Sequence, residues 1–409
     1  MKKILSIVYS NRFLVLLDQA IYSGIGFLVT IFLAHNIEVV NFGLYSSLIL
    51  VSFLIISFSN ALIIQPFQVS SEAYRNSKEY SDFLFFFQIL FNVLLLISAI
   101  IVLNILKPFQ EANMSTLFLL FGMVFHDFSR KYFLGKSLVS HVLAIDFISG
   151  IFQFLSLFLL WRFAGLNLNF IFLALGLPYF ITLIYVLIVI KPSFSFLKNR
   201  KEYLVFHKKE GVWLCLVSFV QWGSANFFIV TLGIFVNVEA LGAFRLVQSI
   251  FGVLNVLFQT YENYVLPTAS KLYSSSMIKS KQYLKSISIQ SSIITGIILL
   301  LLFVFSKDIM FVVGGDKYVE YNYTIKGMCV LYFILFLGYP IRISIRILLL
   351  SKSFFIGYLM AFVFSILFFN VLIKQFQLNG IVIGLIINQF IMLLFWNYQL
   401  HKKNFYLWK

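Results

Sequence analysis

Six residues recur at helical spacing in one apolar stretch of the chain, and their types suit the wall of a binding cavity. They are separated by three or four positions: Arg245, Gln248, Gly252, Asn255, Gln259 and Glu262. At about 3.6 residues per turn, this spacing places them on one face of a helix. A polar face cannot contact lipid, because each unpaired polar group there costs several kcal/mol. The face therefore either bonds a neighbouring helix or lines a wet cavity, and the presence of both Arg and Glu favours the cavity.

Two further arginines could bind an anionic group. Arg342 and Arg346 lie four positions apart in a second apolar stretch, so they share a helix face, and they follow Pro340, which is expected to kink that helix. The forked donors of a guanidinium match the oxygens of a phosphate. Together with Arg245 they are candidates for the cationic part of a substrate cavity. Alternatively, Arg245 and Arg346 lie close enough to the ends of their helices to extend to the membrane interface.

Four acidic residues lie within or at the edge of apolar stretches. Asp18 is expected to line the cavity, and Asp127 and Glu262 are candidates for coupling transport to a proton or sodium ion. A structural alternative for Asp127 is an ion pair with Arg130, because a carboxylate at that depth is costly unless it is paired or protonated. Asp146 lies just inside its stretch and is expected at the interface.

The sequence lacks the patterns of catalytic, metal or nucleotide sites. The histidines are scattered, and no phosphate-binding loop for ATP is present. Cys215 and Cys329 both lie in apolar stretches and suggest packing residues without a disulfide framework. We therefore predict no catalytic residue, no metal and no cofactor, although a proton or sodium ion could still drive the protein.

The composition indicates a membrane protein. Of 409 residues, 61% are hydrophobic and only 11% are charged, which is too little charge for a soluble domain of this length. The net charge of +16 raises the alternative of nucleic-acid binding. Lys and Arg lie in short loops, however, where they set membrane topology and meet anionic lipid headgroups, so no nucleic-acid partner is expected.

Apolar stretches of about 20 residues predict membrane spans. They lie near residues 13–34, 44–64, 83–106, 116–134, 143–163, 170–190, 211–236, 241–265, 284–305, 326–349, 354–373 and 379–400. Lys and Arg concentrate in alternate loops, in the same set as both ends of the chain. This asymmetry predicts a multi-pass protein with cytoplasmic N- and C-termini.

The two halves of the chain share a local pattern. Gly43 opens the second span after a very short turn, and that span ends at Pro66. Gly242 opens the eighth span after a similar turn, and that span ends at Pro267. The predicted fold is therefore all-α, with about twelve transmembrane helices in two six-helix lobes related by a pseudo-two-fold axis. The expected N-terminal lobe is 1–190, the basic cytoplasmic connector 191–210 and the C-terminal lobe 211–409.

These motifs carry a resemblance to a known family. The turn NFGLY at 41–45 and the run LGAFRLVQS…NYVLPTAS from Leu241 to Ser270 resemble the polysaccharide-export flippases of the multidrug/oligosaccharidyl-lipid/polysaccharide (MOP) exporter superfamily, with the O-antigen (Wzx-type) translocases as the closest type. The resemblance implies a transporter of the bacterial cytoplasmic (inner) membrane. It would flip a polyprenyl-pyrophosphate-linked oligosaccharide to the outer leaflet, for surface polysaccharides such as lipopolysaccharide, by alternating access around a central cationic cavity. The chain lacks the two extra spans of the lipid II flippases, which disfavours a peptidoglycan precursor.

Two alternatives stay open. An ion-coupled multidrug or small-molecule exporter of the same superfamily would share the architecture, although it would prefer an acidic cavity for cationic drugs. A membrane-embedded glycan polymerase or ligase would be expected to present a sizeable outer loop, and none is predicted, so an enzyme is not expected. The expected partners are the lipid-linked oligosaccharide, the lipid bilayer and polysaccharide polymerase or assembly proteins.

Overall fold

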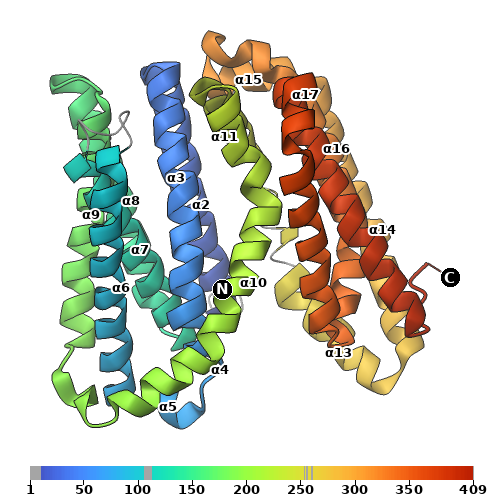
Figure 1. The fold of residues 1–409 in the computed structure, drawn as a ribbon, viewed down its shortest axis with the longest axis horizontal. Helices are drawn as coiled ribbons and strands as arrows, with labels where there is room; N and C mark the ends of the chain where they lie inside the picture. Colours follow the sequence, from blue (N-terminus) through green and yellow to red (C-terminus); the bar gives the residue numbers. More distant parts are fainter. Residues whose placement is uncertain (1–10, 106–112, 253, 255–256, 259–260, 409) are drawn as a thin grey trace, which may run out of the picture. The chain divides into compact units, whose positions relative to one another are not determined.

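The computed structural model describes residues 11–105, 113–252, 254, 257–258 and 261–408, and every regular element in that part of the chain is a helix (Figure 1). The elements of the first half are α2 (Asn11–Asn36), α3 (Val39–Ser59), η1 (Asn60–Ile64), α4 (Gln65–Val69), α5 (Glu72–Asn76), α6 (Lys78–Ile105), α7 (Asn113–Gly135), α8 (Val139–Phe163), α9 (Leu168–Ile190) and η3 (Phe194–Leu197). Those of the second half are α10 (Arg200–Phe235), α11 (Val238–Gly252), η4 (Tyr261–Val265), α13 (Leu266–Ser275), α14 (Met277–Val304), α15 (Ser306–Gly314), η5 (Asp316–Tyr321), α16 (Asn322–Ile347) and α17 (Ser351–Lys402).

In the described chain, nine helical segments are long and apolar enough to cross a bilayer, and they cover ten of the expected spans. One of them, α17, corresponds to the last two spans. It is interrupted at Gln377, whose backbone is not helical (φ 49°, ψ −125°). A Cβ on Gly380 would lie 2.2 Å from the carbonyl oxygen of Leu372, so the chain turns back on itself there.

Two expected spans, at 116–134 and 241–265, are not among these nine segments. The span at 116–134 forms the uninterrupted helix α7, but it carries more charge than an ordinary membrane helix because of Asp127, Arg130 and Lys131. The span at 241–265 is described only in part, as α11 and η4.

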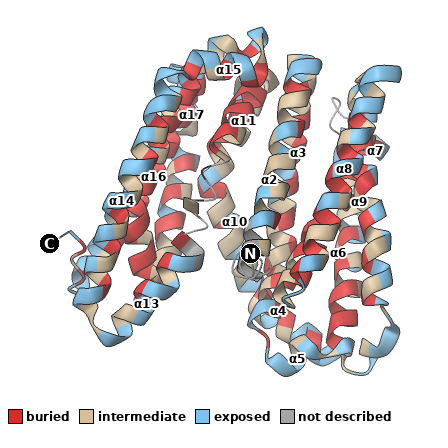
Figure 2. Ribbon diagram, turned by 180° about the vertical axis from the view of Figure 1, so that it is seen from behind, coloured by how far each residue is buried: buried red, intermediate tan, exposed pale blue. Residues whose placement is uncertain are grey.

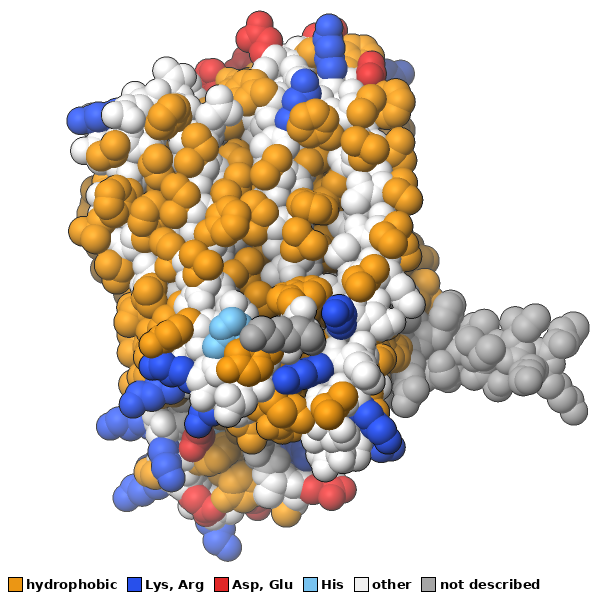
Figure 3. All heavy atoms as spheres, turned by 90° about the vertical axis from the view of Figure 1, so that its right-hand side faces the viewer, with side chains coloured by type: hydrophobic (Ala, Val, Ile, Leu, Met, Phe, Trp, Pro, Cys, Tyr) orange, Lys and Arg blue, Asp and Glu red, His pale blue; other side chains and the backbone are white. Residues whose placement is uncertain are grey.

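Side chains of the long helices present an apolar surface. On the face shown in Figure 3, hydrophobic side chains form a broad belt, and Lys and Arg gather toward its lower end. On α14, large hydrophobic residues recur at helical spacing with half or more of their surface exposed: Ile289, Ile293, Ile297, Leu300 and Val304. Exposed apolar side chains at this density match a helix that faces lipid.

The chain forms two compact units that do not follow the order of the sequence. Unit 1 contains the chain up to Val29 together with Leu48–Phe219, and unit 2 contains Thr30–Ser47 together with Val220–Lys409. The expected lobes, by contrast, were divided at the connector 191–210. In the structure the connector contains the short helix η3 and the start of α10, which runs without a break from Arg200 to Phe235.

The turn between α2 and α3 is attached to the rest of unit 2. His35 Nε2 lies 2.9 Å from the carbonyl oxygen of Val312, and Lys317 Nζ donates to the carbonyl oxygen of Ile37 at 3.0 Å. The ring of Phe42 packs edge-on against Tyr318 with centroids 5.8 Å apart. These contacts join the first hairpin of the chain to residues far along the sequence.

Glycines allow close helix packing in unit 1. A Cβ on Gly176 of α9 would lie 3.0 Å from the backbone of Leu119 in α7. A Cβ on Gly150 of α8 would lie 2.1 Å from Ile25 Cδ1 in α2. These approaches bring α9 against α7 and α8 against α2, around a buried interior that Figure 2 shows in red. Phe67, Phe125, Phe128 and Phe133 pack within this unit with almost no exposed surface.

The second span of each half contains a π-helix in the same place. The π-helix η1 directly follows α3 and is followed by Gln65 and Pro66, and in the other half η4 is followed by Leu266 and Pro267. Proline cannot donate the hydrogen bond that an α-helix requires of it, so a wider turn before it is a local solution. The matching π-helices support the internal repeat predicted from Gly43 and Gly242.

In unit 1 the π-helix is held by α10. In an α-helix the carbonyl of Leu62 would accept from residue 66, which is a proline; here it lies 2.8 Å from His207 Nδ1. Since a carbonyl oxygen only accepts, Nδ1 carries the proton, and Nε2 of the neutral ring accepts from the Tyr80 hydroxyl at 2.7 Å. A Cβ on Gly211, one turn beyond His207, would lie 3.2 Å from Leu62 Cα. Thus α10 both packs against and hydrogen-bonds the irregular turn of α3.

Candidate functional site

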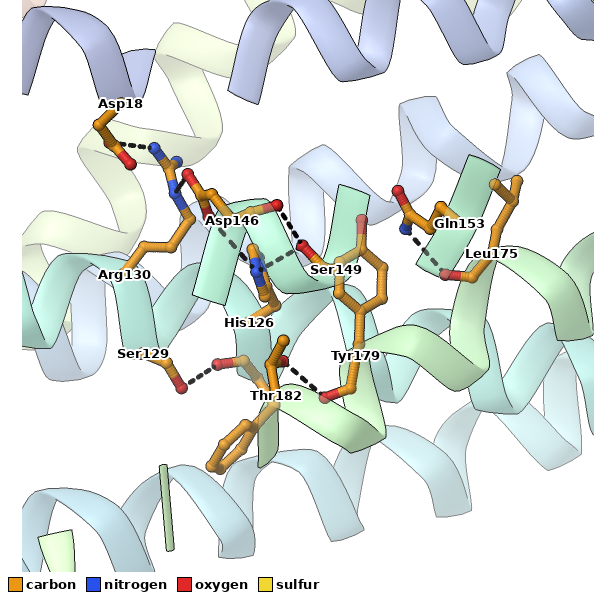
Figure 4. Close-up of polar contacts among 11 residues, drawn as sticks. Asp18, His126, Ser129, Arg130, Asp146, Ser149, Gln153, Leu175, Tyr179 and Thr182 are labelled. Carbon is orange, nitrogen blue, oxygen red and sulfur yellow. Dashed lines mark hydrogen bonds and ion pairs between the residues drawn. The ribbon is translucent and has the colours of Figure 1, made fainter. Parts of the chain in front are cut away.

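The main polar feature of unit 1 is an arginine held between two buried carboxylates (Figure 4). Arg130 of α7 donates from Nη2 to Asp18 Oδ2 of α2 at 2.8 Å, and from Nε to Asp146 Oδ2 of α8 at 2.7 Å. The three residues are 6%, 2% and 1% exposed. Removing charges from solvent is costly, and the two ion pairs offset part of that cost.

Aromatic and imidazole rings surround the guanidinium. Arg130 Cζ lies 3.8 Å from the centre of the Tyr22 ring, a cation–π contact. His126, one turn before Arg130, has its Nε2 3.4 Å from Asp146 Oδ1 and 3.3 Å from Ser149 Oγ. The ring of Tyr179 from α9 lies 4.7 Å from that of His126. Side chains from α2, α7, α8 and α9 therefore meet at one place within unit 1.

Helical spacing explains why these residues meet. On α8, Asp146, Ser149 and Gln153 recur at intervals of three and four, and all are buried on the face toward α7 and α9. Gln153 Nε2 donates to the carbonyl oxygen of Leu175 in α9 at 2.9 Å. The close approach of Gly150 to Ile25 then places Asp18, two turns earlier in α2, near Asp146. We call Asp18, Arg130, Asp146 and His126 the buried charge cluster.

Two carboxylates of this region need comment. Asp146, expected near the membrane interface, is 1% exposed and paired with Arg130 inside unit 1, and its depth in the membrane stays a prediction. Asp127 does not make the expected ion pair with Arg130; its Oδ2 lies 2.8 Å from Lys131 Nζ, one turn further along α7. Arg130 is instead held by Asp18 and Asp146 from α2 and α8, and Asp127 pairs with the neighbouring Lys131. Asp18 pairs with Arg130 and is 2% exposed, and its expected place in a cavity wall stays a prediction.

The polar stripe at 241–262 is described only in part. Arg245 Nη1 donates to Gln248 Oε1 at 2.8 Å, so these two residues share a helix face as their spacing predicts. Asn255 and Gln259 lie outside the described residues, and of Glu262 only the backbone, in η4, is described. Whether the stripe lines a cavity therefore stays a prediction.

Arg342 of α16 lies beside aromatic rings. Arg342 Cζ is 5.4 Å from the ring centre of Tyr339 and 5.8 Å from that of Phe354. Arg342 and Arg346 are both partly exposed within unit 2, and α16 continues through Pro340 to Ile347. Guanidinium groups stack on aromatic faces, which fixes the plane of the donor fork.

Sequence reasoning missed Arg130 and His126 as site residues. From the sequence, Arg130 was considered only as an alternative partner of Asp127. The available signal was the four-residue step from His126 to Arg130 together with the buried spacing of Asp146, Ser149 and Gln153. Two polar faces on neighbouring apolar helices indicate that the faces bond to one another.

Comparisons with known proteins show the fold. No family model and no curated protein sequence matches this chain. A solved structure of an inward-facing multidrug resistance MATE family transporter of the MOP superfamily is similar, with a TM-score of 0.74 and 10% identity over 94% of this chain and 95% of that one. The lipid II flippase MurJ, in an inward closed conformation, gives 0.70 and 14% identity over 95% of this chain and 88% of that one. A mutant of the Vibrio cholerae MATE transporter VcmN gives 0.61 and 12% identity over 97% of both chains.

The expected fold class is confirmed: this is an all-α, multi-pass chain with the fold of MOP transporters and flippases. Because the sequence identities are only 10% to 14%, the similarity shows a shared fold and does not identify a substrate.

Proposed function

We propose that this protein flips a polyprenyl-pyrophosphate-linked oligosaccharide from the cytoplasmic to the outer leaflet, for surface polysaccharide synthesis. The substrate has an anionic pyrophosphate, a polar glycan and a long apolar tail. Transport by alternating access would move the head through the protein while the tail stays in lipid. No bond is made or broken in this step, so the protein acts as a transporter and not as an enzyme.

The observation that supports the proposal is the position of Arg245 and Arg342 within apolar helices of a fold that a lipid II flippase shares. An arginine inside an apolar helix is costly and usually serves a pathway. The stacking of Arg342 on Tyr339 and Phe354 orients a fork that suits two phosphate oxygens. The sequence resemblance to O-antigen translocases favours a glycan on that lipid, since Leu241–Ser270 carries the motif.

The proposed function also predicts the membrane location of the protein and its partner proteins. We place the protein in a bacterial cytoplasmic membrane with both termini in the cytoplasm, because Lys and Arg concentrate in that set of loops. Polysaccharide polymerase or assembly proteins are the proposed partners, since they would consume the flipped lipid. The stripe residues Gln248, Asn255 and Gln259, with Arg346, are proposed to complete the cavity.

The buried charge cluster favours ion coupling, and with it a second candidate, an ion-coupled exporter of small molecules. One guanidinium faces two carboxylates, so one more positive charge would neutralise the group. A proton or a sodium ion could supply that charge at Asp18 or Asp146. Asp127 and Glu262 remain proposed coupling residues, although the partner of Asp127 in the structure is Lys131.

Reconstituted proteoliposomes test the substrate. The full chain is incorporated with a fluorescent polyprenyl-pyrophosphate oligosaccharide, and a membrane-impermeant quencher reports the amount in the outer leaflet over time. We expect Arg245→Gln and Arg342→Gln each to slow flipping by at least about tenfold, the effect of losing one charge-assisted hydrogen bond. Arg162→Gln is the matched control, because Arg162 is an exposed arginine at the end of α8.

Two outcomes would overturn the proposal. One is wild-type flipping by the double variant Arg245→Gln/Arg342→Gln at equal protein content. The other is transport of a cationic dye, with no movement of the lipid, which would support the exporter. A sodium or proton gradient applied in the same vesicles tests coupling, and Asp18→Asn and Asp146→Asn are expected to remove any dependence on it.

A further inference from the structure

The segment between α9 and α10 is fixed firmly to unit 1. The carboxylate of Asp82, which has no exposed surface, accepts from Ser193 Oγ at 2.6 Å and from Ser195 Oγ at 2.7 Å. Lys78 pairs with the same carboxylate and also donates to the carbonyl oxygen of Lys191 at 2.9 Å. A buried carboxylate with three partners is a strong anchor, so this segment holds a defined position.

Aromatic stacking adds to the attachment. The rings of Phe86 and Phe194 are stacked with centroids 4.7 Å apart, and Phe196 packs against Phe83 and Phe86. The basic stretch of the connector is therefore a structured surface and not a loose tether.

The acidic residues beside this segment are engaged by its own contacts. Glu79 accepts from Asn199 Nδ2 at 2.8 Å, and Glu202 accepts from the hydroxyl of Tyr74. The hydrogen bond to Glu202 raises the pKa of Tyr74 to about 12, so the hydroxyl stays protonated over the physiological range. Glu202 is exposed and Glu210 is partly exposed, so the surface of residues 198–210 carries five exposed cations beside these two carboxylates and is net basic.

The outward side combines cations with apolar side chains. Its cations are exposed, and no described carboxylate forms an ion pair with them: Lys198, Arg200, Lys201, Lys208 and Lys209. Between them lie apolar side chains with 45 to 67% of their surface exposed: Phe194, Leu197, Leu204 and Val205. We call these nine residues the basic platform.

Measured along α10, the platform extends from the headgroup layer to beyond it. The apolar part of α10 begins near Gly211 and continues to Phe235. At a rise of about 1.5 Å per residue, Lys209 lies about 3 Å and Arg200 about 16 Å beyond Gly211. The headgroup layer occupies roughly the first 5 to 8 Å outside the hydrocarbon core. Leu204 and Val205, about 10 Å from Gly211, then lie just beyond it, within reach if α10 is tilted.

We propose that the basic platform binds anionic phospholipid headgroups and inserts its apolar side chains among them. Each lysine or arginine beside an anionic membrane contributes to binding, and exposed apolar side chains add to the attraction. Because the platform is bonded to α6 and continues into α10, which contacts the π-helix of α3 through His207, bound lipid would stabilise this end of unit 1. The inference does not depend on the identity of the transported substrate.

Lipid-dependent thermal unfolding of the purified full chain in detergent tests the proposal. Phosphatidylglycerol is titrated at low salt, with phosphatidylethanolamine as the zwitterionic comparison. The platform variant replaces Lys198, Arg200, Lys201, Lys208 and Lys209 by Gln. The matched control replaces five exposed lysines of unit 2 by Gln: Lys271, Lys279, Lys285, Lys352 and Lys403.

We expect phosphatidylglycerol to raise the unfolding temperature of the wild type and of the control at similar concentrations. The platform variant should require more than about tenfold more lipid, and salt should weaken the wild-type response. Leu204→Ser/Val205→Ser, which keeps every charge, should weaken the response less and leave its salt dependence intact. Equal responses of the platform variant and the control would overturn the proposal. So would stabilisation by soluble glycerol phosphate at the concentration that suffices for the lipid.

Discussion

Gly43 and Gly242, which open the second span of each half of the chain, lie directly against one another. A Cβ on Gly242 would be 3.1 Å from Gly43 Cα, and a Cβ on Gly43 would be 2.2 Å from the carbonyl oxygen of Val238. The repeat therefore has a physical reason at this point. Each copy needs a residue without a side chain, because the two helices approach through their backbones.

The first prediction concerns this contact. Gly43→Val should destabilise the protein by about 1–3 kcal/mol, because the backbone of Val238 cannot move aside as a flexible side chain would. Thermal unfolding in detergent measures the effect. The control is Gly24→Ala in α2, where nothing lies within 4 Å of the added carbon and the gain in helix propensity is about 0.5–1 kcal/mol. Equal stability of Gly43→Val and the wild type would contradict the close approach.

The second prediction concerns the buried charge cluster. Arg130→Gln leaves Asp18 and Asp146 without their cation and should cost about 3–5 kcal/mol of stability. The exposed Arg162→Gln should change stability by no more than about 0.5 kcal/mol. Combining Arg130→Met with Asp18→Asn and Asp146→Asn removes all three charges and should recover most of the loss. A triple variant no more stable than Arg130→Gln would show that charge balance is not the cause.

The third prediction concerns the π-helix of α3. His207→Ala removes the hydrogen bond to the Leu62 carbonyl and should cost about 1–3 kcal/mol. His207→Gln can still donate and should retain part of that stability. Tyr80→Phe removes only the outer hydrogen bond to His207 and should cost about 0.5–1.5 kcal/mol. Chemical denaturation of the three variants distinguishes these effects, and an order other than Ala lowest would argue against the hydrogen bond.

The fourth prediction concerns the anchor of the basic platform. Asp82→Ala should release the segment, and trypsin should then cleave after Lys198 and Arg200 several times faster than in the wild type. Glu202→Gln is the control, because it alters only the contact with Tyr74. Mass spectrometry of the early fragments identifies the cleavage sites. Cleavage of the wild type at the same rate as Asp82→Ala would mean that Asp82 does not hold the segment.

Most of the architecture was predictable from the sequence. Apolar stretches mark the spans because a bilayer tolerates little else, and the glycine and proline pattern predicted the repeat. The helix α7 was recognised as a span even though Asp127, Arg130 and Lys131 make it unusually polar. The turn within α17 at Gln377 also falls between two predicted spans.

The partners of individual charges were not predictable in the same way. Asp127 and Arg130 are three residues apart on α7, yet Asp127 pairs with Lys131, whereas Asp18 and Asp146 reach Arg130 from other helices. That choice depends on the close approach of α2 and α8 at Gly150, which no local pattern reveals. The assignment of Thr30–Ser47 to unit 2 has the same origin, because it depends on contacts with residues more than 200 positions away.

The attachment of His35 to Val312 has a consequence for biosynthesis. His35 and Val312 are 277 positions apart, and Ile37 and Lys317 are 280 positions apart. At roughly 5–20 residues per second, a ribosome needs on the order of tens of seconds to make the missing stretch. The helices α2 and α3 of the nascent chain are thus inserted before their hydrogen-bond partners Val312 and Lys317 have been synthesised. The membrane insertion machinery, or lipid itself, must keep α2 and α3 able to form these contacts until the last third of the polypeptide has been synthesised.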